Sequence, residues 1–154
     1  MMLLAAITGL SVPKPAECPD PIQGTWVGIE RRPSGWLHYT VQVHSPAEGI
    51  LQGTILGHFW GTPDRTPPRC TDYAHDQFIA HQSATGTFLD GKLDFEALAV
   101  DRIERRCGRV RPYLADHLTG HLRAPSVIDV VSDDGGAPPS HVVLTRIACH
   151  SPGA

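Results

Sequence analysis

Histidines are the residues of this 154-residue chain with the most evident capacity for chemistry, because there are nine of them and neutral imidazole is a common metal ligand. His117 and His121 lie four residues apart on one face of a predicted strand. In an extended strand that spacing spans about 13 Å, which is too far for both rings to bind one ion without a bend. A helix would bring them together, but Thr119 and Gly120 disfavour a helix. We therefore expect no metal and no cofactor, and keep His117 and His121 as the alternative metal pair.

Sequence patterns that accompany nucleophilic catalysis are missing. The chain has no Gly-x-Ser-x-Gly elbow and no Cys-x-x-Cys pair. Asp90 and Asp94 flank a predicted turn, where aspartate needs no catalytic explanation. The sequence leaves enzymatic activity open and favours a non-catalytic protein.

Five arginines are concentrated between residues 102 and 111. They are Arg102, Arg105, Arg106, Arg109 and Arg111. Such a cluster could bind an anion or a phosphate, but Asp101 and Glu104 offset part of its charge, and a solvated loop is the favoured interpretation. With a net charge of -3 and a pI near 6.3, the chain lacks the broad basic surface of a nucleic-acid-binding protein.

Aromatic residues near a Pro-rich segment form the remaining candidate site. Trp36 falls on the polar face of a predicted strand, and Phe59 and Trp60 end another strand just before residues 61–71. Loops rich in Pro beside aromatic side chains can line the mouth of a binding pocket. We predict that Trp36, Tyr39, Phe59 and Trp60 contribute to ligand binding, with the capping of a hydrophobic core as the alternative role for Trp36.

The elements that position these residues are predicted to be strands. Leu37, Tyr39, Val41 and Val43 alternate with more polar residues, and a period of two is the signature of a strand with one buried face. The same pattern recurs over most of the chain. The predicted strands cover residues 24–32, 36–44, 50–60, 77–82, 86–89, 92–100, 116–123, 127–132 and 141–149.

The connections favour an all-β fold of next-neighbour antiparallel hairpins. Asp90-Gly91 between two apolar runs is a strong hairpin signal. Residues 96–107 could form a short helix, but we favour a strand followed by a loop. Gly53 and Gly57, inside a strand, are expected to mark bulges or bends. We predict an eight- or nine-stranded up-and-down barrel, with a β-sandwich as the alternative, because either arrangement hides the sheet edges.

The ends of the chain suggest export. Residues 1–17 consist of a short apolar run followed by a Pro-rich segment, and they fit a signal peptide or a disordered segment. The apolar run is too short to span a bilayer. We expect one β-domain over residues 18–150 and a tail over 151–154. The predicted location is periplasmic or extracellular.

Four cysteines without close spacing suit disulfides better than a metal site. Of the three possible connectivities, we favour Cys18–Cys149, which would tie the ends of the domain together, and Cys70–Cys107, which would pin two central loops.

Gly24-Thr25-Trp26 opens the first predicted strand, and Arg146 lies in the last one. At these two short sites the chain resembles the calycin group of up-and-down barrels, such as lipocalins and avidins. In those families the Trp of a Gly-x-Trp triplet packs across the closed end of the barrel, commonly against a basic residue of the final strand. The resemblance therefore implies a barrel plug made of Trp26 and Arg146 through a cation–π contact.

Three functional hypotheses follow. The first is an exported, non-catalytic binding module for a small, largely apolar molecule, held by inward side chains such as Leu37, Tyr39, Val41 and Ile55. The second is a filled barrel or sandwich that contacts another envelope protein and binds no ligand. The third is a metal-dependent enzyme built on strand histidines.

Overall fold

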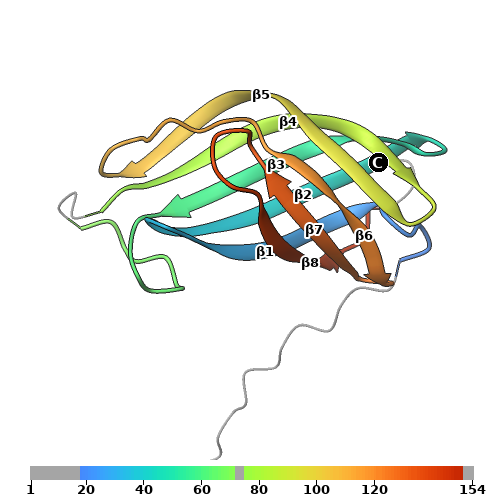
Figure 1. Ribbon diagram of the computed structural model, residues 1–154, viewed down its shortest axis with the longest axis horizontal. Coiled ribbons are helices and arrows are strands. Elements are labelled where there is room, and N and C mark those ends of the chain that lie inside the picture. The colour runs from blue at the N-terminus through green and yellow to red at the C-terminus, as the bar shows by residue number, and fades with distance from the viewer. Residues whose placement is uncertain (1–17, 72–74, 151–154) are drawn as a thin grey trace, which may run out of the picture.

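The computed structural model describes residues 18–71 and 75–150, which form a closed barrel of eight antiparallel strands (Figure 1). Each strand pairs with its sequence neighbours, and β1 pairs with β8 to close the sheet. The strands are β1 (Gly24–Arg32), β2 (Gly35–Ala47), β3 (Ile50–Trp60), β4 (Gln77–Leu89), β5 (Lys92–Cys107), β6 (His117–Ala124), β7 (Val127–Asp133) and β8 (Ser140–Ala148). The predicted up-and-down barrel is confirmed, with eight strands, and the sandwich alternative is wrong.

Alternation along the strands builds the core. On β2, Leu37, Tyr39, Val41 and Val43 are almost fully buried, and Ile55 on β3 joins them. They belong to one hydrophobic cluster that extends around the barrel to Phe95 and Leu144. The inward positions predicted from the period of two are therefore confirmed.

β4 and β5 are longer than the sequence pattern indicated. Residues 77–82 and 86–89 belong to one strand. Because β5 continues to Cys107, the loop expected after residue 100 and the short helix considered for residues 96–107 are both wrong. Three register shifts between β4 and β5 let the two strands stay paired up to Gln77 and Cys107. Such irregularities interrupt the alternation of inward and outward side chains. The sequence pattern therefore did not predict the full length of the two strands. Gly108, with a φ of +67°, turns the chain after the strand.

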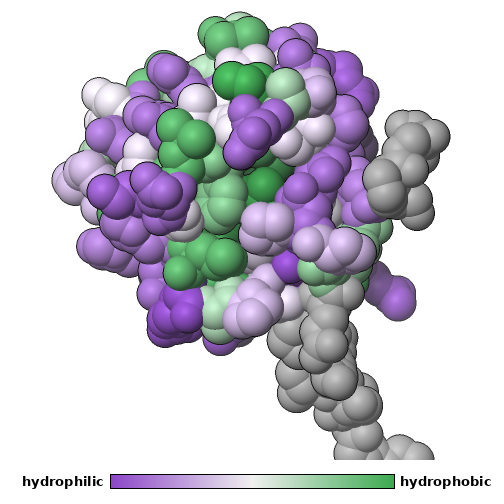
Figure 2. All heavy atoms as spheres, turned by 90° about the vertical axis from the view of Figure 1, so that its right-hand side faces the viewer, coloured by the Kyte–Doolittle hydropathy of each residue, from purple (hydrophilic) through white to green (hydrophobic). Residues whose placement is uncertain are grey.

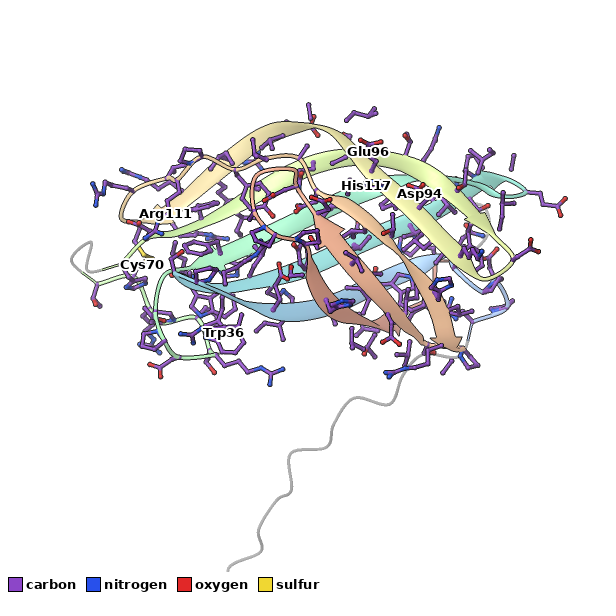
Figure 3. All side chains as sticks on the ribbon, viewed as in Figure 1. Trp36, Cys70, Asp94, Glu96, Arg111 and His117 are labelled. Atoms are coloured by element: carbon purple, nitrogen blue, oxygen red, sulfur yellow. A yellow bond between two sulfur atoms is a disulfide. The ribbon has the colours of Figure 1, made fainter. Side chains whose placement is uncertain are left out.

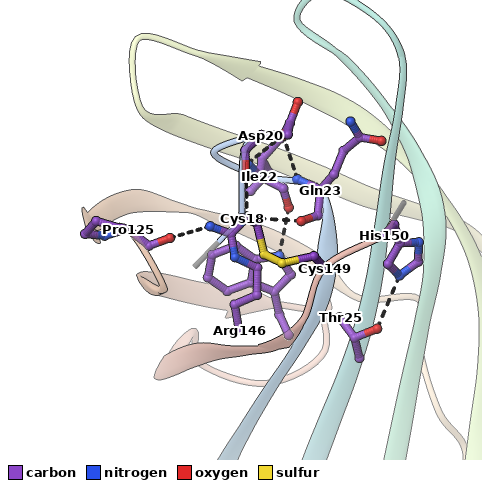
Figure 4. Close-up of a disulfide and its surroundings, with 10 residues drawn as sticks. Cys18, Asp20, Ile22, Gln23, Thr25, Pro125, Arg146, Cys149 and His150 are labelled. Carbon is purple, nitrogen blue, oxygen red and sulfur yellow. Dashed lines mark hydrogen bonds between the residues drawn. A yellow bond between two sulfur atoms is a disulfide. The ribbon is translucent and has the colours of Figure 1, made fainter. Parts of the chain in front are cut away.

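Trp26 and Arg146, the residues of the predicted plug, lie in contact at one end of the barrel, here called the closed end. Figure 4 shows Arg146 there, beside the Cys18–Cys149 disulfide. The guanidinium of Arg146 lies 4.9 Å from the centre of the Trp26 ring. It donates hydrogen bonds to the carbonyl oxygens of Asp20, Gln23 and Pro125 at 2.7, 3.0 and 2.6 Å. The plug thus fastens the segment before β1 and the β6–β7 turn to the barrel wall.

The surface of the closed end is mixed in character. Figure 2 views the molecule from this side and shows apolar residues near the middle, surrounded by hydrophilic ones. Ile50 and Leu89, beside the β2–β3 and β4–β5 turns, are 47% and 58% exposed.

Both predicted disulfides are present. Cys18–Cys149 joins the two ends of the described domain at the closed end, and Cys70–Cys107 joins the β3–β4 connection to the end of β5. The predicted leader, residues 1–17, and the predicted tail, residues 151–154, lie outside the described residues. Within the described part of the chain, no helix has the length and apolarity needed to cross a membrane.

Candidate binding site at the open end of the barrel

The end of the barrel opposite the plug carries a pocket of about 200 Å³. It lies among the β1–β2 turn, the ends of β2 to β4, and the connections that follow β5 and β7. The lining residues are Arg32, Pro33, Ser34, Leu37, Phe59, Phe78, Arg111, Pro112, Tyr113, Asp134 and Ala137. We call this space the mouth pocket.

Aromatic rings form one wall of the mouth pocket. Phe59 and Phe78 are partners on neighbouring strands, with ring centres 5.3 Å apart. Tyr113 meets Phe78 edge-to-face at 6.0 Å. Leu37 continues this wall on β2. The wall is an apolar surface suited to a flat or aliphatic group.

Tyr113 reaches the interior because Gly57 leaves room for it. A Cβ atom at residue 57 would lie 2.3 Å from the Tyr113 hydroxyl. The β2–β3 register runs through Gly53 and Gly57 without a shift, so the expected bulges are absent there. The glycine at 57 instead admits a side chain from the β5–β6 connection.

A buried polar network lies beneath the pocket, centred on Asp116. The Tyr113 hydroxyl donates to Asp116 at 2.8 Å, and the Gln82 amide donates to the same carboxylate at 2.5 Å. The Asp116 backbone N–H donates back to the Gln82 side chain at 2.9 Å. Burial raises the pKa of Asp116, although the hydrogen bonds from Gln82 and Tyr113 act in the opposite direction.

The second half of the network holds Arg32 at the edge of the pocket. Arg32 pairs with Glu30 at 2.7 Å and donates to the Tyr39 hydroxyl at 3.1 Å. The Tyr39 hydroxyl also lies 3.0 Å from Glu30 and 2.8 Å from Ser132, and Ser140 donates to Glu30. These bonds fix the guanidinium in place and compensate its charge.

The two tyrosines of the network serve as neutral hydrogen-bonding groups. Burial raises the pKa of Tyr39, and the carboxylates of Asp116 and Glu30 raise it further. Burial and Asp116 also raise the pKa of Tyr113 well above its usual value. Both phenols therefore stay protonated at physiological pH, and they orient neighbours instead of acting as bases.

The four predicted ligand-binding residues fall into two groups. Phe59 lines the mouth pocket, and Tyr39 lies in the network below it. Trp36 and Trp60 are cross-strand partners on the outer face of the barrel. Their indole N–H groups donate to the carbonyl oxygens of Pro63 and Asp64 at 3.0 and 2.9 Å. The Pro-rich segment therefore covers the outer wall beside these tryptophans, and the mouth pocket lies on the other side of the sheet.

Sequence reasoning missed Arg32, Phe78, Tyr113 and Asp116 as site residues. The inward position of Phe78 could have been predicted from alternation, because this residue follows the apolar pattern of β4. Asp116 begins the predicted strand over residues 116–123 and has the parity of the buried Leu118, so alternation could have placed it inward. Tyr113 comes from the connection after β5, where no periodicity shows which side chains point inward.

The alternative metal pair does not converge. The Nε2 atom of His117 lies 2.8 Å from the Asp94 carboxylate, which accepts the hydrogen bond across the β5–β6 pair, and His121 is exposed opposite Lys92. Figure 3 shows Asp94 and His117 on β5 and β6, far from the end of the barrel that carries Arg111. Among the described residues, the one cluster with metal-ligand geometry is Cys70, His75 and Cys107, and its two cysteines are joined in a disulfide.

No family model, no curated protein and no solved structure matches the chain.

Proposed function

We propose that this protein is an exported, non-catalytic binding module that takes a small, largely apolar molecule into the mouth pocket. The observation that carries the proposal is the arrangement of Leu37, Phe59, Phe78 and Tyr113 as an apolar wall above a fixed polar floor. A few placed polar groups within an apolar concavity are typical of small-molecule sites. The resemblance to calycin-type barrels supports the same function.

The size of the pocket limits the ligand. About 200 Å³ is below the 300–1,000 Å³ range of drug-sized sites, so the ligand has one or two rings or a short chain. Deeper in the barrel, the space is filled by core side chains such as Phe95 and Leu118, both fully buried. The pocket is a shallow mouth above a packed interior.

The polar floor supports binding in preference to catalysis. Glu30, Arg32, Tyr39 and Asp116 are committed to bonds with one another and with neighbours. A general base or nucleophile has to face the substrate and exchange a proton with it. Groups that are buried and mutually satisfied instead provide a rigid surface.

Export is supported by the two disulfides, since such bridges persist in oxidising compartments. Fractionation of cells that produce the full-length chain tests this part of the proposal. We expect the protein outside the cytoplasm with no reactive thiols after denaturation. Four reactive thiols in a cytoplasmic protein would contradict export.

A neutral probe of matched size tests the binding function. In a ¹H–¹⁵N NMR titration, 2-naphthylmethanol should shift the amides of Phe59, Phe78 and Tyr113. About 12 heavy atoms at roughly 0.4 kcal/mol each give a Kd on the order of 0.3 mM.

Two tryptophan substitutions provide the matched comparison. Ala137→Trp adds a large ring to the pocket lining and should weaken binding at least fivefold. Leu98→Trp adds the same ring at a position that is 71% exposed on β5, and should leave binding unchanged. If wild-type protein shows no shifts, or if both variants behave alike, the filled-barrel hypothesis with a protein partner replaces the binding module.

A further inference from the structure

A second hollow, of about 500 Å³, lies beside the mouth pocket at the same end of the barrel. It is lined by Gly61, His75, Asp76, Arg105, Gly108, Arg109 and Arg111. We call it the basic cleft. Three of the five clustered arginines thus face one hollow, where the sequence favoured a solvated loop.

Covalent and hydrogen-bonded contacts fix the shape of the basic cleft. The Cys70–Cys107 disulfide ties its two sides together. Gly108 takes a positive φ, and a Cβ atom there would lie 2.3 Å from the His75 carbonyl oxygen. Asp76 accepts from the backbone N–H of Arg109 at 2.8 Å. The cleft is therefore formed before any ligand arrives.

The charge of the cleft is positive. Among the lining residues that the structure describes, Asp76 is the one carboxylate. Hydrogen bonds from the Arg109 backbone and the Arg111 side chain hold the pKa of Asp76 below its usual value, so it is ionised at neutral pH. Among the described lining residues, Arg109 and Arg111 against this carboxylate leave a formal excess of one positive charge (2 − 1), and Arg105, which has a contact of its own, is not counted.

Arg111 connects the cleft to the mouth pocket, because it lines both. Its Nε lies 2.8 Å from Asp76, and its guanidinium lies 5.5 Å from the centre of the Phe59 ring. The contact with Asp76 uses Nε, so the terminal nitrogens stay outside that bond. A ligand whose apolar part rests on Phe59 would place a short polar substituent beside this guanidinium. Figure 3 labels Arg111 at this end of the barrel.

From this juxtaposition we propose that the basic cleft is an anion subsite, and that the ligand is a small aromatic or short-chain carboxylate whose oxygens pair with Arg109 and Arg111. The inference rests on the proposed function of the mouth pocket. Guanidinium groups suit this task because their planar donors match the geometry of a carboxylate.

The test compares two probes that share a ring system: 2-naphthoate, which is anionic, and 2-naphthylmethanol, which is neutral. Isothermal titration calorimetry or NMR titration of the full-length protein gives both affinities. We expect 2-naphthoate to bind at least tenfold more tightly. Arg109→Gln should reduce this ratio to threefold or less while leaving the affinity for 2-naphthylmethanol unchanged. Arg123→Gln removes the same charge at the closed end and should change neither affinity.

The outcomes distinguish a failure of the anion subsite from a failure of the proposed function. Binding of both probes with equal affinity would overturn the anion subsite and leave the proposed function intact. A preference for 2-naphthoate that responds equally to Arg109→Gln and Arg123→Gln would also overturn it, since long-range charge would then explain the preference. Failure of both probes to bind would refute the proposed function itself.

Added inorganic phosphate identifies the kind of anion. At 10 mM, phosphate should weaken 2-naphthoate binding by less than a factor of two if the cleft needs the attached ring. Strong competition, with 2-naphthylmethanol unaffected, would replace the carboxylate assignment with a free-phosphate site.

Discussion

Replacing Arg146 with methionine tests how much the plug contributes to stability. Arg146 is 1% exposed and makes three hydrogen bonds to backbone carbonyl oxygens, in addition to its contact with Trp26. Hydrogen bonds from charged donors contribute about 1.5 kcal/mol or more each, which gives about 4.5 kcal/mol for three. The cation–π contact adds about 1–2 kcal/mol. Methionine fills much of the volume and removes the cost of burying a charge, which offsets part of this sum.

We therefore expect Arg146→Met to lower the free energy of unfolding by about 3–4 kcal/mol. Urea denaturation under oxidising conditions measures it, with the Cys18–Cys149 bridge intact. At a slope of about 2 kcal/mol per M, the midpoint should fall by roughly 1.5–2 M. Arg123→Met is the control, because Arg123 is a largely exposed arginine on β6 and should cost about 0.5 kcal/mol or less. A loss below 1 kcal/mol for Arg146→Met would refute the reasoning, since the three bonds would then be replaceable by water.

Three further predictions concern the open end. Gly57→Ala should displace the Tyr113 hydroxyl and cost about 1–3 kcal/mol in urea denaturation, with altered Tyr113 ring signals in NMR spectra; unchanged signals would contradict the packing argument. The pKa of Asp116 is raised by folding, so its contribution to stability is complete below the unfolded value of about 3.9 and is lost as pH rises through the folded value. The stability of wild type relative to Asp116→Asn should therefore be greater at pH 4 than at pH 7, and the opposite slope in paired urea titrations would show that ionisation of Asp116 is favoured. Replacing both Cys70 and Cys107 with serine should lower stability by about 4 kcal/mol, as expected for a cross-link between residues 37 apart, and a loss under 1 kcal/mol would show that the unfolded chain gains little freedom.

The barrel was predictable from the sequence because side chains along each strand alternate between the inside and the outside of the sheet. Leu37, Tyr39 and Val41 face inward for reasons that depend only on their own strand. The spacing of the cysteines favoured disulfides over a metal site, and the resemblance to calycin barrels implied the plug of Trp26 and Arg146. Where this alternation of side chains is interrupted, as at the register shifts between β4 and β5, the prediction of a loop was wrong.

The mouth pocket was only partly predictable because it combines segments that are distant in sequence. Phe59 was named, but Tyr113 and Asp116 enter the barrel from an irregular connection. The placement of Tyr113 depends on the absence of a side chain at Gly57, which is 56 residues earlier in the sequence. The residue pattern within either segment does not predict a contact between Gly57 and Tyr113.

Arginine illustrates why residue type alone does not define a site. At the closed end, the terminal nitrogens of Arg146 are used by protein carbonyl groups, so this guanidinium is a structural fastener. At the open end, Arg111 gives Nε to Asp76 and lies against Phe59 at the junction of two hollows. The same chemical group closes the barrel at one end and faces a ligand-sized space at the other. The two arginines differ in the number of protein oxygens that they bond. Because Arg111 bonds fewer of them, we expect an anion to bind at Arg111 and in the basic cleft.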